Sequence, residues 1–225
     1  YRSLQANNIP LQFTNTQSAS AGYRYQKTIS MFFASILANY SHTQLDNIIK
    51  STINNNIQTN NVIPFANNIT SFTLNGSIGK YLINLNTNIG FDVSMRNGGG
   101  KQLQNNVLFP YQNRSLTFGF NTNTRFTKNI NWLFRSNYTL NNSLINKVKT
   151  SELVQLKQFS KIDATLFKKI TLGLSANHIF IHQAQQRNLN YLFTDVNLKY
   201  KWLKIKTDFE FSINNLSNIK NFNTY

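Results

Sequence analysis

The 225-residue sequence contains no cysteine, only three prolines, and only seven Asp and Glu residues against 23 Lys and Arg residues. Without cysteine, it forms neither a disulfide framework nor a thiolate metal site. It has no apolar run of the roughly 20 residues that a membrane-spanning helix requires. Its first residues, YRSLQANN, include neither an initiator methionine nor a signal peptide. We therefore expect the chain to be an excerpt of a longer precursor.

What is abundant is asparagine and positive charge. The 37 asparagines would weaken helix and sheet interiors alike, because the amide side chain competes for backbone hydrogen bonds. The formal charge of +16 normally points to nucleic acid or anionic lipid as a partner. Here the basic residues are scattered, with no run longer than Lys168-Lys169. Nucleotide bias in the source genome explains such a composition equally well, so the charge alone predicts no partner, and we expect no nucleic-acid binding.

One stretch, INLNTNIGFDVSMR at residues 83–96, alternates strictly between two kinds of side chain. Six of the seven residues of one parity are apolar, and the seven residues of the other parity are asparagine, glycine, aspartate, serine or arginine. A period of two is the signature of a β-strand with unlike faces. Its fourteen residues exceed the usual length of about five or six residues. We therefore predict a single long strand over residues 83–96.

The same alternation recurs along the chain, and no 3.6-residue helical period competes with it. It predicts about ten strands in all, the other nine near residues 19–26, 32–40, 71–80, 116–126, 130–140, 160–168, 169–180, 191–202 and 204–214.

The connections between these strands alternate in length. Short turns are expected near residues 27–28, 80–81, 127–129, 168–169 and 202–204, and long polar links near 43–66, 97–110, 143–157, 183–189 and from 215 onward. This arrangement is typical of an antiparallel meander with tight turns at one rim and long loops at the other.

The acidic and aromatic residues agree with this assignment. No Asp or Glu falls on an apolar parity: five lie on polar parities, and Asp46 and Glu152 lie in long links. Tyr25, Phe126, Trp132, Tyr200 and Trp202 cluster beside the short turns, where a lipid-facing girdle would place amphipathic rings.

A membrane accounts for all of these features together. A sheet in hydrocarbon must pair every backbone amide and close on itself, since each unsatisfied group costs several kcal/mol. Outward residues then meet lipid and inward asparagines meet water. We therefore predict an all-β fold, an antiparallel up-and-down transmembrane β-barrel. About ten of its strands are present, and the short turns are expected on the periplasmic side.

Three segments carry a resemblance to a known family: GYRYQK at residues 22–27, MFFASILANYSHTQLDNII at 31–49, and DFEFSINNLSNIKNFNTY at 208–225. They resemble the C-terminal barrel portion of TonB-dependent receptor-like outer-membrane proteins of the Bacteroidetes type. The last resembles a late strand followed by that family's "NNLFN" element, with Ser217 standing where the family usually has phenylalanine.

The resemblance implies a barrel of about 22 strands around an N-terminal plug, importing a scarce ligand with energy from a TonB-type inner-membrane complex. It places the protein in the outer membrane of a Gram-negative bacterium, in contact with lipid and lipopolysaccharide, and allows a surface lipoprotein as partner. Residues 1–225 would then form one partial barrel domain. We expect the plug, the TonB box and the closing strand or strands to lie outside it.

No pattern predicts an enzyme, a cofactor or a metal site. His178 and His182 are four residues apart, which on a strand is about 13 Å, too far for one metal ion. GGGK at residues 98–101 lacks the Ser or Thr of a phosphate loop and reads as a flexible extracellular loop tip. Asp208 and Glu210 are expected to pair with Arg or Lys across the lumen wall.

The expected function is therefore a receptor or transporter barrel for an unidentified ligand. Candidates for ligand contact are the lumen-facing residues Asp92, Arg96, Arg125 and Arg135. Two alternatives stay open: a structural or adhesive outer-membrane barrel without transport, and, more remotely, a soluble basic β-protein that binds polyanions.

Overall fold

The computed structural model describes residues 2–5, 13–54, 57–184, 186–202 and 204–216. Nearly all of these residues form strands of one sheet, and the only helical element is a three-residue 3-10 turn, η1 (Ile83–Leu85). No helix in the described part of the chain is long and apolar enough to cross a membrane. The predicted all-β, antiparallel up-and-down architecture is confirmed, and it is consistent with part of a β-barrel.

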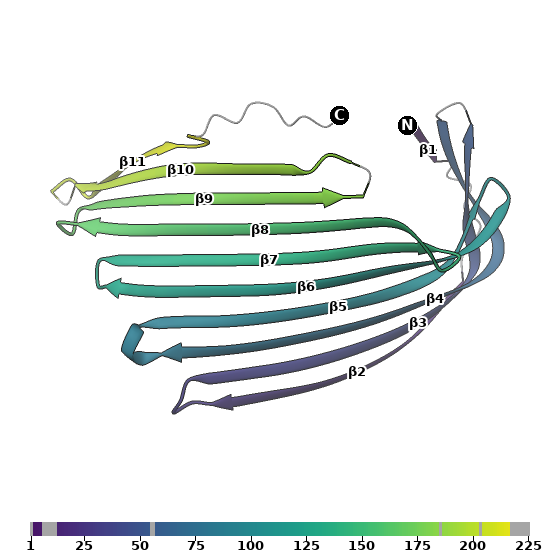
Figure 1. Ribbon diagram of the computed structural model, residues 1–225, viewed down its shortest axis with the longest axis horizontal. Coiled ribbons are helices and arrows are strands. Elements are labelled where there is room, and N and C mark those ends of the chain that lie inside the picture. The colour runs from purple at the N-terminus through teal and green to yellow at the C-terminus, as the bar shows by residue number, and fades with distance from the viewer. Residues whose placement is uncertain (1, 6–12, 55–56, 185, 203, 217–225) are drawn as a thin grey trace.

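Ten strands run up and down in sequence order, each antiparallel to the next (Figure 1). A short additional strand, β1 (Arg2–Gln5), pairs in parallel with β4. The ten are β2 (Thr14–Lys27), β3 (Phe32–Asn54), β4 (Ile57–Leu82), β5 (Thr87–Gln104), β6 (Val107–Thr127), β7 (Ile130–Ile145), β8 (Val148–Leu166), β9 (Ile170–Gln183), β10 (Leu189–Trp202) and β11 (Thr207–Ile213).

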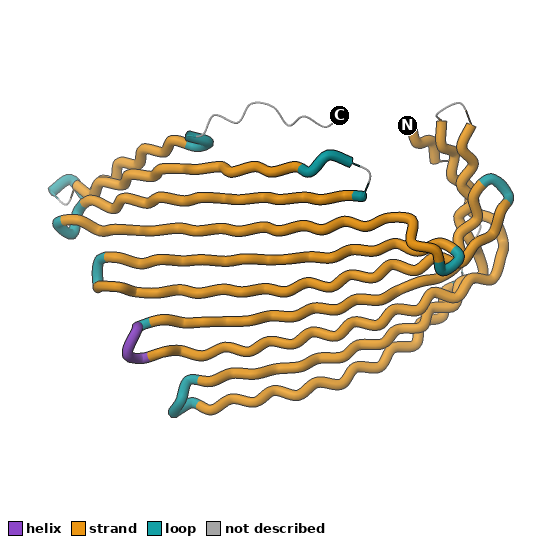
Figure 2. The backbone as a smooth tube through the Cα atoms, viewed as in Figure 1, coloured by secondary structure: helices purple, strands orange, loops and turns teal. Residues whose placement is uncertain are grey.

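Five tight turns gather at one end of the sheet, at the left in Figures 1 and 2. They join β2 to β3, β4 to β5, β6 to β7, β8 to β9 and β10 to β11. Four lie within one or two residues of their predicted places. The fifth lies at residues 83–86, so the predicted strand over residues 83–96 is wrong at its start: η1 forms the turn, and Asn86 adopts a left-handed φ of 46°. The strand begins only at Thr87.

The opposite end also differs from the prediction, because most of the expected long polar links are strand. β5 extends to Gln104 and β6 begins at Val107, leaving a two-residue turn. The GGGK segment therefore lies inside β5 rather than at a loop tip. A Cβ atom on Gly99 would come within 2.5 Å of the Tyr111 carbonyl oxygen, so this glycine permits β6 to approach closely. The predicted link from residue 215 onward lies largely outside the described residues.

The β3–β4 hairpin is the longest and bends away from the rest of the sheet beyond a bulge at Asp46 (Figure 1). Where β4 separates from β5, the Asn67 side chain takes the place of the backbone hydrogen bonds between the two strands. Its amide nitrogen donates to the Lys101 carbonyl, and its oxygen accepts from the Lys101 N–H. The Asp46 carboxylate accepts from the Phe13 N–H at 3.0 Å. That bond and one from the Asn47 amide lower the pKa of Asp46.

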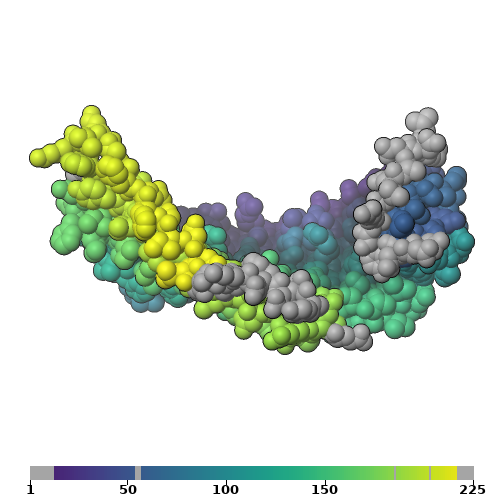
Figure 3. Space-filling view, turned by 90° about the horizontal axis from the view of Figure 1, so that it is seen from above, coloured from purple at the N-terminus to yellow at the C-terminus, as the bar shows by residue number. Residues whose placement is uncertain are grey.

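The sheet is a single curved layer (Figure 3). Ile48 and Phe109 are the only buried apolar side chains in the part of the chain that the structure describes. Ile48 lies in the outer half of the β3–β4 hairpin, and Phe109 lies near the end of the β5–β6 hairpin beside it. A soluble domain normally buries one face of a sheet against a second layer. No such layer covers either face among the described residues.

Register places most of the large apolar side chains of the ten strands on one surface, here called the apolar face. Large side chains of this face are exposed on every strand, although ring pairs such as Phe91–Phe120, with centroids 4.9 Å apart, cover part of them. One exposed member from each strand in order is Tyr23, Ile36, Ile78, Phe91, Phe118, Tyr138, Ile162, Leu174, Leu198 and Phe211.

Two long edges of the sheet have no neighbour among the described residues: the outer edge of β2 and that of β11. Every residue of both strands is exposed. The sheet is therefore open as described, and the backbone groups along these edges remain available for pairing.

Candidate functional site

The surface opposite the apolar face, here called the polar face, holds the predicted site residues. Backbone alternation directs successive side chains to opposite faces, and register carries this assignment from strand to strand. Asp92 and Arg96 come from β5, Arg125 from β6 and Arg135 from β7. All four are exposed and share the polar face, as predicted from their parity.

Asp92 and Arg135 are the two that register brings near each other. Asp92 accepts a hydrogen bond from the Asn121 side chain at 3.2 Å, and Asn121 is the register partner of Arg135. Asn121 lies flat over Gly90, where an added Cβ would come within 2.6 Å of the amide. A carboxylate, an amide and a guanidinium thus line adjacent positions on three strands, which supplies both donors and acceptors to a polar ligand.

Arg96 and Arg125 stand apart from this pair. Arg96 is four residues from Asp92 along β5, about 13 Å away towards the long-hairpin end. Arg125 lies near the tight turns, where its backbone N–H donates to the Asn86 carbonyl at 3.0 Å. The four residues therefore do not form one cluster. None of them takes part in the three ion pairs found among the described residues.

A depression of about 500 Å³ adjoins Asp92 on the polar face. It extends from Arg24 on β2 to Asn137 on β7, so residues from six strands line it. Gly119 lies between Asp92 and Asn137, and a Cβ there would come within 3.1 Å of the Asn137 side-chain oxygen. Many of its lining residues are Gly, Ser, Thr and Asn, whose small or polar side chains make this part of the polar face recessed and hydrophilic.

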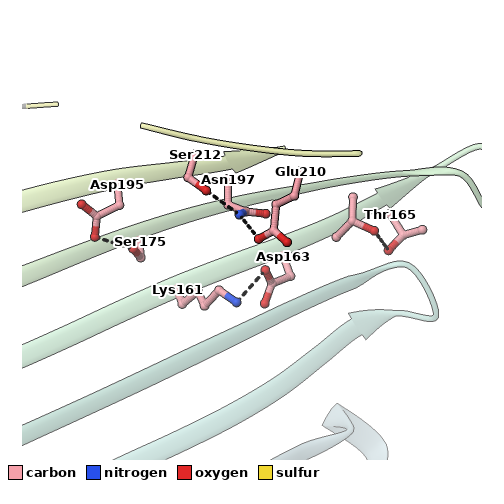
Figure 4. A network of polar contacts seen from close by, with 9 residues as sticks. Lys161, Asp163, Thr165, Ser175, Asp195, Asn197, Glu210 and Ser212 are labelled. Carbon is pink, nitrogen blue, oxygen red and sulfur yellow. Dashed lines mark hydrogen bonds and ion pairs between the residues drawn. The ribbon is translucent and has the colours of Figure 1, made fainter. Parts of the chain in front are cut away.

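A second polar region covers β8 to β11 (Figure 4). Lys161 pairs with Asp163 at 3.0 Å, and Asp195 accepts from the Ser175 hydroxyl. The Asn197 amide donates to both Glu210 and Ser212. Next to these, Lys199 pairs with Asp208 at 2.9 Å. Each of these carboxylates thus has a hydrogen-bond or ion-pair partner on its own strand or a neighbouring one.

This region bears out one expectation and corrects another. Asp208 pairs with a lysine across the wall, as predicted. For Glu210 the hydrogen-bond partner is the Asn197 amide rather than Lys or Arg, although Glu210 is the register partner of Lys199.

Sequence reasoning missed a polar bridge on the apolar face. The two ring nitrogens of His178 lie 2.9 Å from Gln158 Oε1 and 2.8 Å from Asn190 Oδ1, linking β8, β9 and β10. The available signal was the parity of His178, which follows Leu172, Leu174 and Ala176. His182 contacts Asn188 instead. No group of three or more His, Asp or Glu residues in the described ranges could hold a metal ion.

Comparison with known proteins adds no family assignment. No model of a known protein family matches the chain, and no curated protein matches it.

Proposed function

We propose that the chain is part of the barrel wall of an outer-membrane receptor or transporter, similar to the TonB-dependent receptors. The observation that carries the proposal is the apolar face: large apolar side chains stay exposed on all ten strands, with no second layer over them in the described residues. In water such a surface would be a large liability, since typical monomers expose contiguous apolar patches of only a few hundred Å². Against lipid it is stabilising.

The extent of the apolar face along the strands fits a bilayer. On β3 it runs from Phe32 to Tyr40, and on β7 from Trp132 to Leu140. Nine residues at a tilt of about 45° come close to the 9–11 residues of a typical transmembrane strand. Beyond these limits the strands continue as polar hairpins, which would stand in water.

Aromatic rings mark one boundary of that zone. Phe126, in a bulge, stacks on Trp132 with centroids 6.3 Å apart, and Trp202 lies beside Phe209 at 6.3 Å. Tyr25 packs near Phe32 at the first tight turn. Tyrosine and tryptophan prefer the interface between hydrocarbon and water, so these rings support an interface at the tight-turn end.

Transport is supported by the polar face and by the sequence resemblance. A wall of Asn, Ser, Thr and charged side chains suits a water-filled interior or a plug domain. Asp92, Asn121 and Arg135 would present their polar groups to whatever occupies that interior.

Membrane insertion is tested by fractionating cells that make the full-length protein. We expect the protein in outer membranes, released by detergent and not by 1 M salt or carbonate, and migrating faster on gels before heating than after. Extraction by salt alone would refute the barrel and favour a soluble polyanion-binding protein.

The coding sequence upstream of Tyr1 separates a receptor from a structural barrel. A domain of more than about a hundred residues before Tyr1, able to fill a barrel, supports the receptor. A signal peptide joined directly to Tyr1 would overturn the transport role and favour a smaller structural or adhesive barrel.

A further inference from the structure

The fold gathers lysines that are scattered in the sequence onto one rim. Each of the five tight turns has at least one lysine within three residues, and all of these side chains are exposed. We call this set the lysine rim: Lys27, Lys80, Lys128, Lys168, Lys169, Lys201, Lys204 and Lys206.

Acidic residues are missing from the same turns. No Asp or Glu occurs at residues 27–31, 80–87, 125–131, 166–170 or 201–207. The nearest acid to the last turn, Asp208, already pairs with Lys199, and no lysine of the rim belongs to an ion pair among the described residues. Eight uncompensated ammonium groups at one end create a positive potential there, which a counter-charge would relieve.

The rim lies directly against the end of the apolar face. Lys27 follows Tyr25 by two residues and shares its side of β2, and Lys80 bears the same relation to Ile78 on β4. Lysines in such positions lay their carbon chains along apolar surface and extend the ammonium group outward into the headgroup layer.

We propose that the lysine rim binds the phosphates of anionic lipid headgroups in the leaflet at the tight-turn end of the sheet. The proposal rests on the membrane placement argued above and adds the chemistry that this boundary recognises. Lysine is a compact point charge that suits phosphate without demanding a fixed geometry. Its distribution over five turns, in place of one patch, matches a ring of lipids better than one acidic protein.

The test compares two variants of the full-length protein with equal change in charge. The rim variant carries Lys168→Gln, Lys169→Gln, Lys204→Gln and Lys206→Gln. The control variant carries Lys101→Gln, Arg114→Gln, Lys147→Gln and Arg187→Gln, which are exposed residues towards the opposite end of the sheet. Each protein is reconstituted into phosphatidylcholine vesicles with and without one-fifth phosphatidylglycerol. Retained phosphatidylglycerol per protein is then counted by native mass spectrometry.

We expect the rim variant to retain at least about fivefold less phosphatidylglycerol, the factor expected for one lysine near an anionic surface. The control variant should match the wild type. Equal retention by the rim variant and the wild type would overturn the proposal while leaving membrane insertion intact. Unchanged lipid retention with salt-sensitive loss of a co-purifying acidic protein would overturn it in favour of a protein partner. Failure of the wild type to enter either kind of vesicle would overturn membrane placement itself.

Discussion

Replacing Phe91 by arginine gives the most direct measure of what covers the apolar face. The Phe91 side chain is 56% exposed, and its ring lies 4.9 Å from that of Phe120. Its position, second of four apolar-face residues on the segment from Ile89 to Met95, is near the middle of the proposed hydrocarbon zone. An arginine at the midplane of a barrel costs about 2–4 kcal/mol in unfolding free energy.

In water the same change would cost much less. The lost ring pair is worth about 0.5–1.5 kcal/mol, and an exposed guanidinium incurs no desolvation cost. Asn88→Arg serves as the control, because Asn88 lies on the same strand, is exposed, and faces the polar side. We expect it to change stability by less than about 1 kcal/mol.

The assay is reversible denaturant unfolding of the full-length protein in lipid vesicles, followed by tryptophan fluorescence and by gel mobility. Phe91→Leu provides a second control that keeps the site apolar and should cost less than about 1.5 kcal/mol. Equal costs for Phe91→Arg and Asn88→Arg would refute the assignment of the two faces. A cost below about 1 kcal/mol for Phe91→Arg would refute hydrocarbon at this position.

Three further predictions address other parts of the sheet. Gly99→Ala should destabilise the protein by about 1–3 kcal/mol, because the new methyl group meets the Tyr111 carbonyl oxygen at 2.5 Å. Gly79→Ala, whose nearest contact is 3.7 Å, should be close to neutral. Equal denaturation midpoints for the two variants would contradict this prediction. His178→Leu should lower the free energy of unfolding by about 1–3 kcal/mol, because it leaves the Gln158 and Asn190 side-chain amides unpaired. Replacing all three residues by leucine should recover most of that stability. A triple variant less stable than His178→Leu would refute the bridge. Since the folded pKa of Asp46 is lowered, its stabilising effect should be present above its ordinary value of 3.8 and lost as pH falls through the folded pKa. Asp46→Asn should therefore speed hydrogen exchange of the Phe13 amide at pH 7 but not at low pH, and equal exchange at pH 7 would argue against the carboxylate.

Strand existence and face assignment followed from parity alone, because apolar side chains recur at alternate positions on one side of each strand. The exception at residues 83–86 has a physical cause. A 3-10 turn exposes Ile83 and Leu85, both at least 60% exposed, and the alternation of these apolar residues with Asn84 and Asn86 imitates a strand. Only the left-handed backbone of Asn86, a conformation asparagine tolerates, separates the two readings.

The long hairpins could not be predicted because their signal disappears outside the apolar zone. Once both faces of a strand stand in polar surroundings, hydrophobicity no longer alternates, yet the backbone ladder continues, as it does between Gly98 and Gln104. The pairing of Asp92 with Asn121 was equally hidden. It depends on the register between β5 and β6, which the sequence of either strand does not reveal.

The exposed edge of β2 bears on how the polypeptide behaves when it is made by itself. Every second residue of this fourteen-residue strand presents its N–H and C=O groups outward without a partner among the described residues, on a strand with no proline and only two charges. Such an edge is a template for intermolecular pairing. Residues 1–225 expressed alone should collect as β-rich aggregates, and a chaperone that holds this edge would be needed to keep them dispersed.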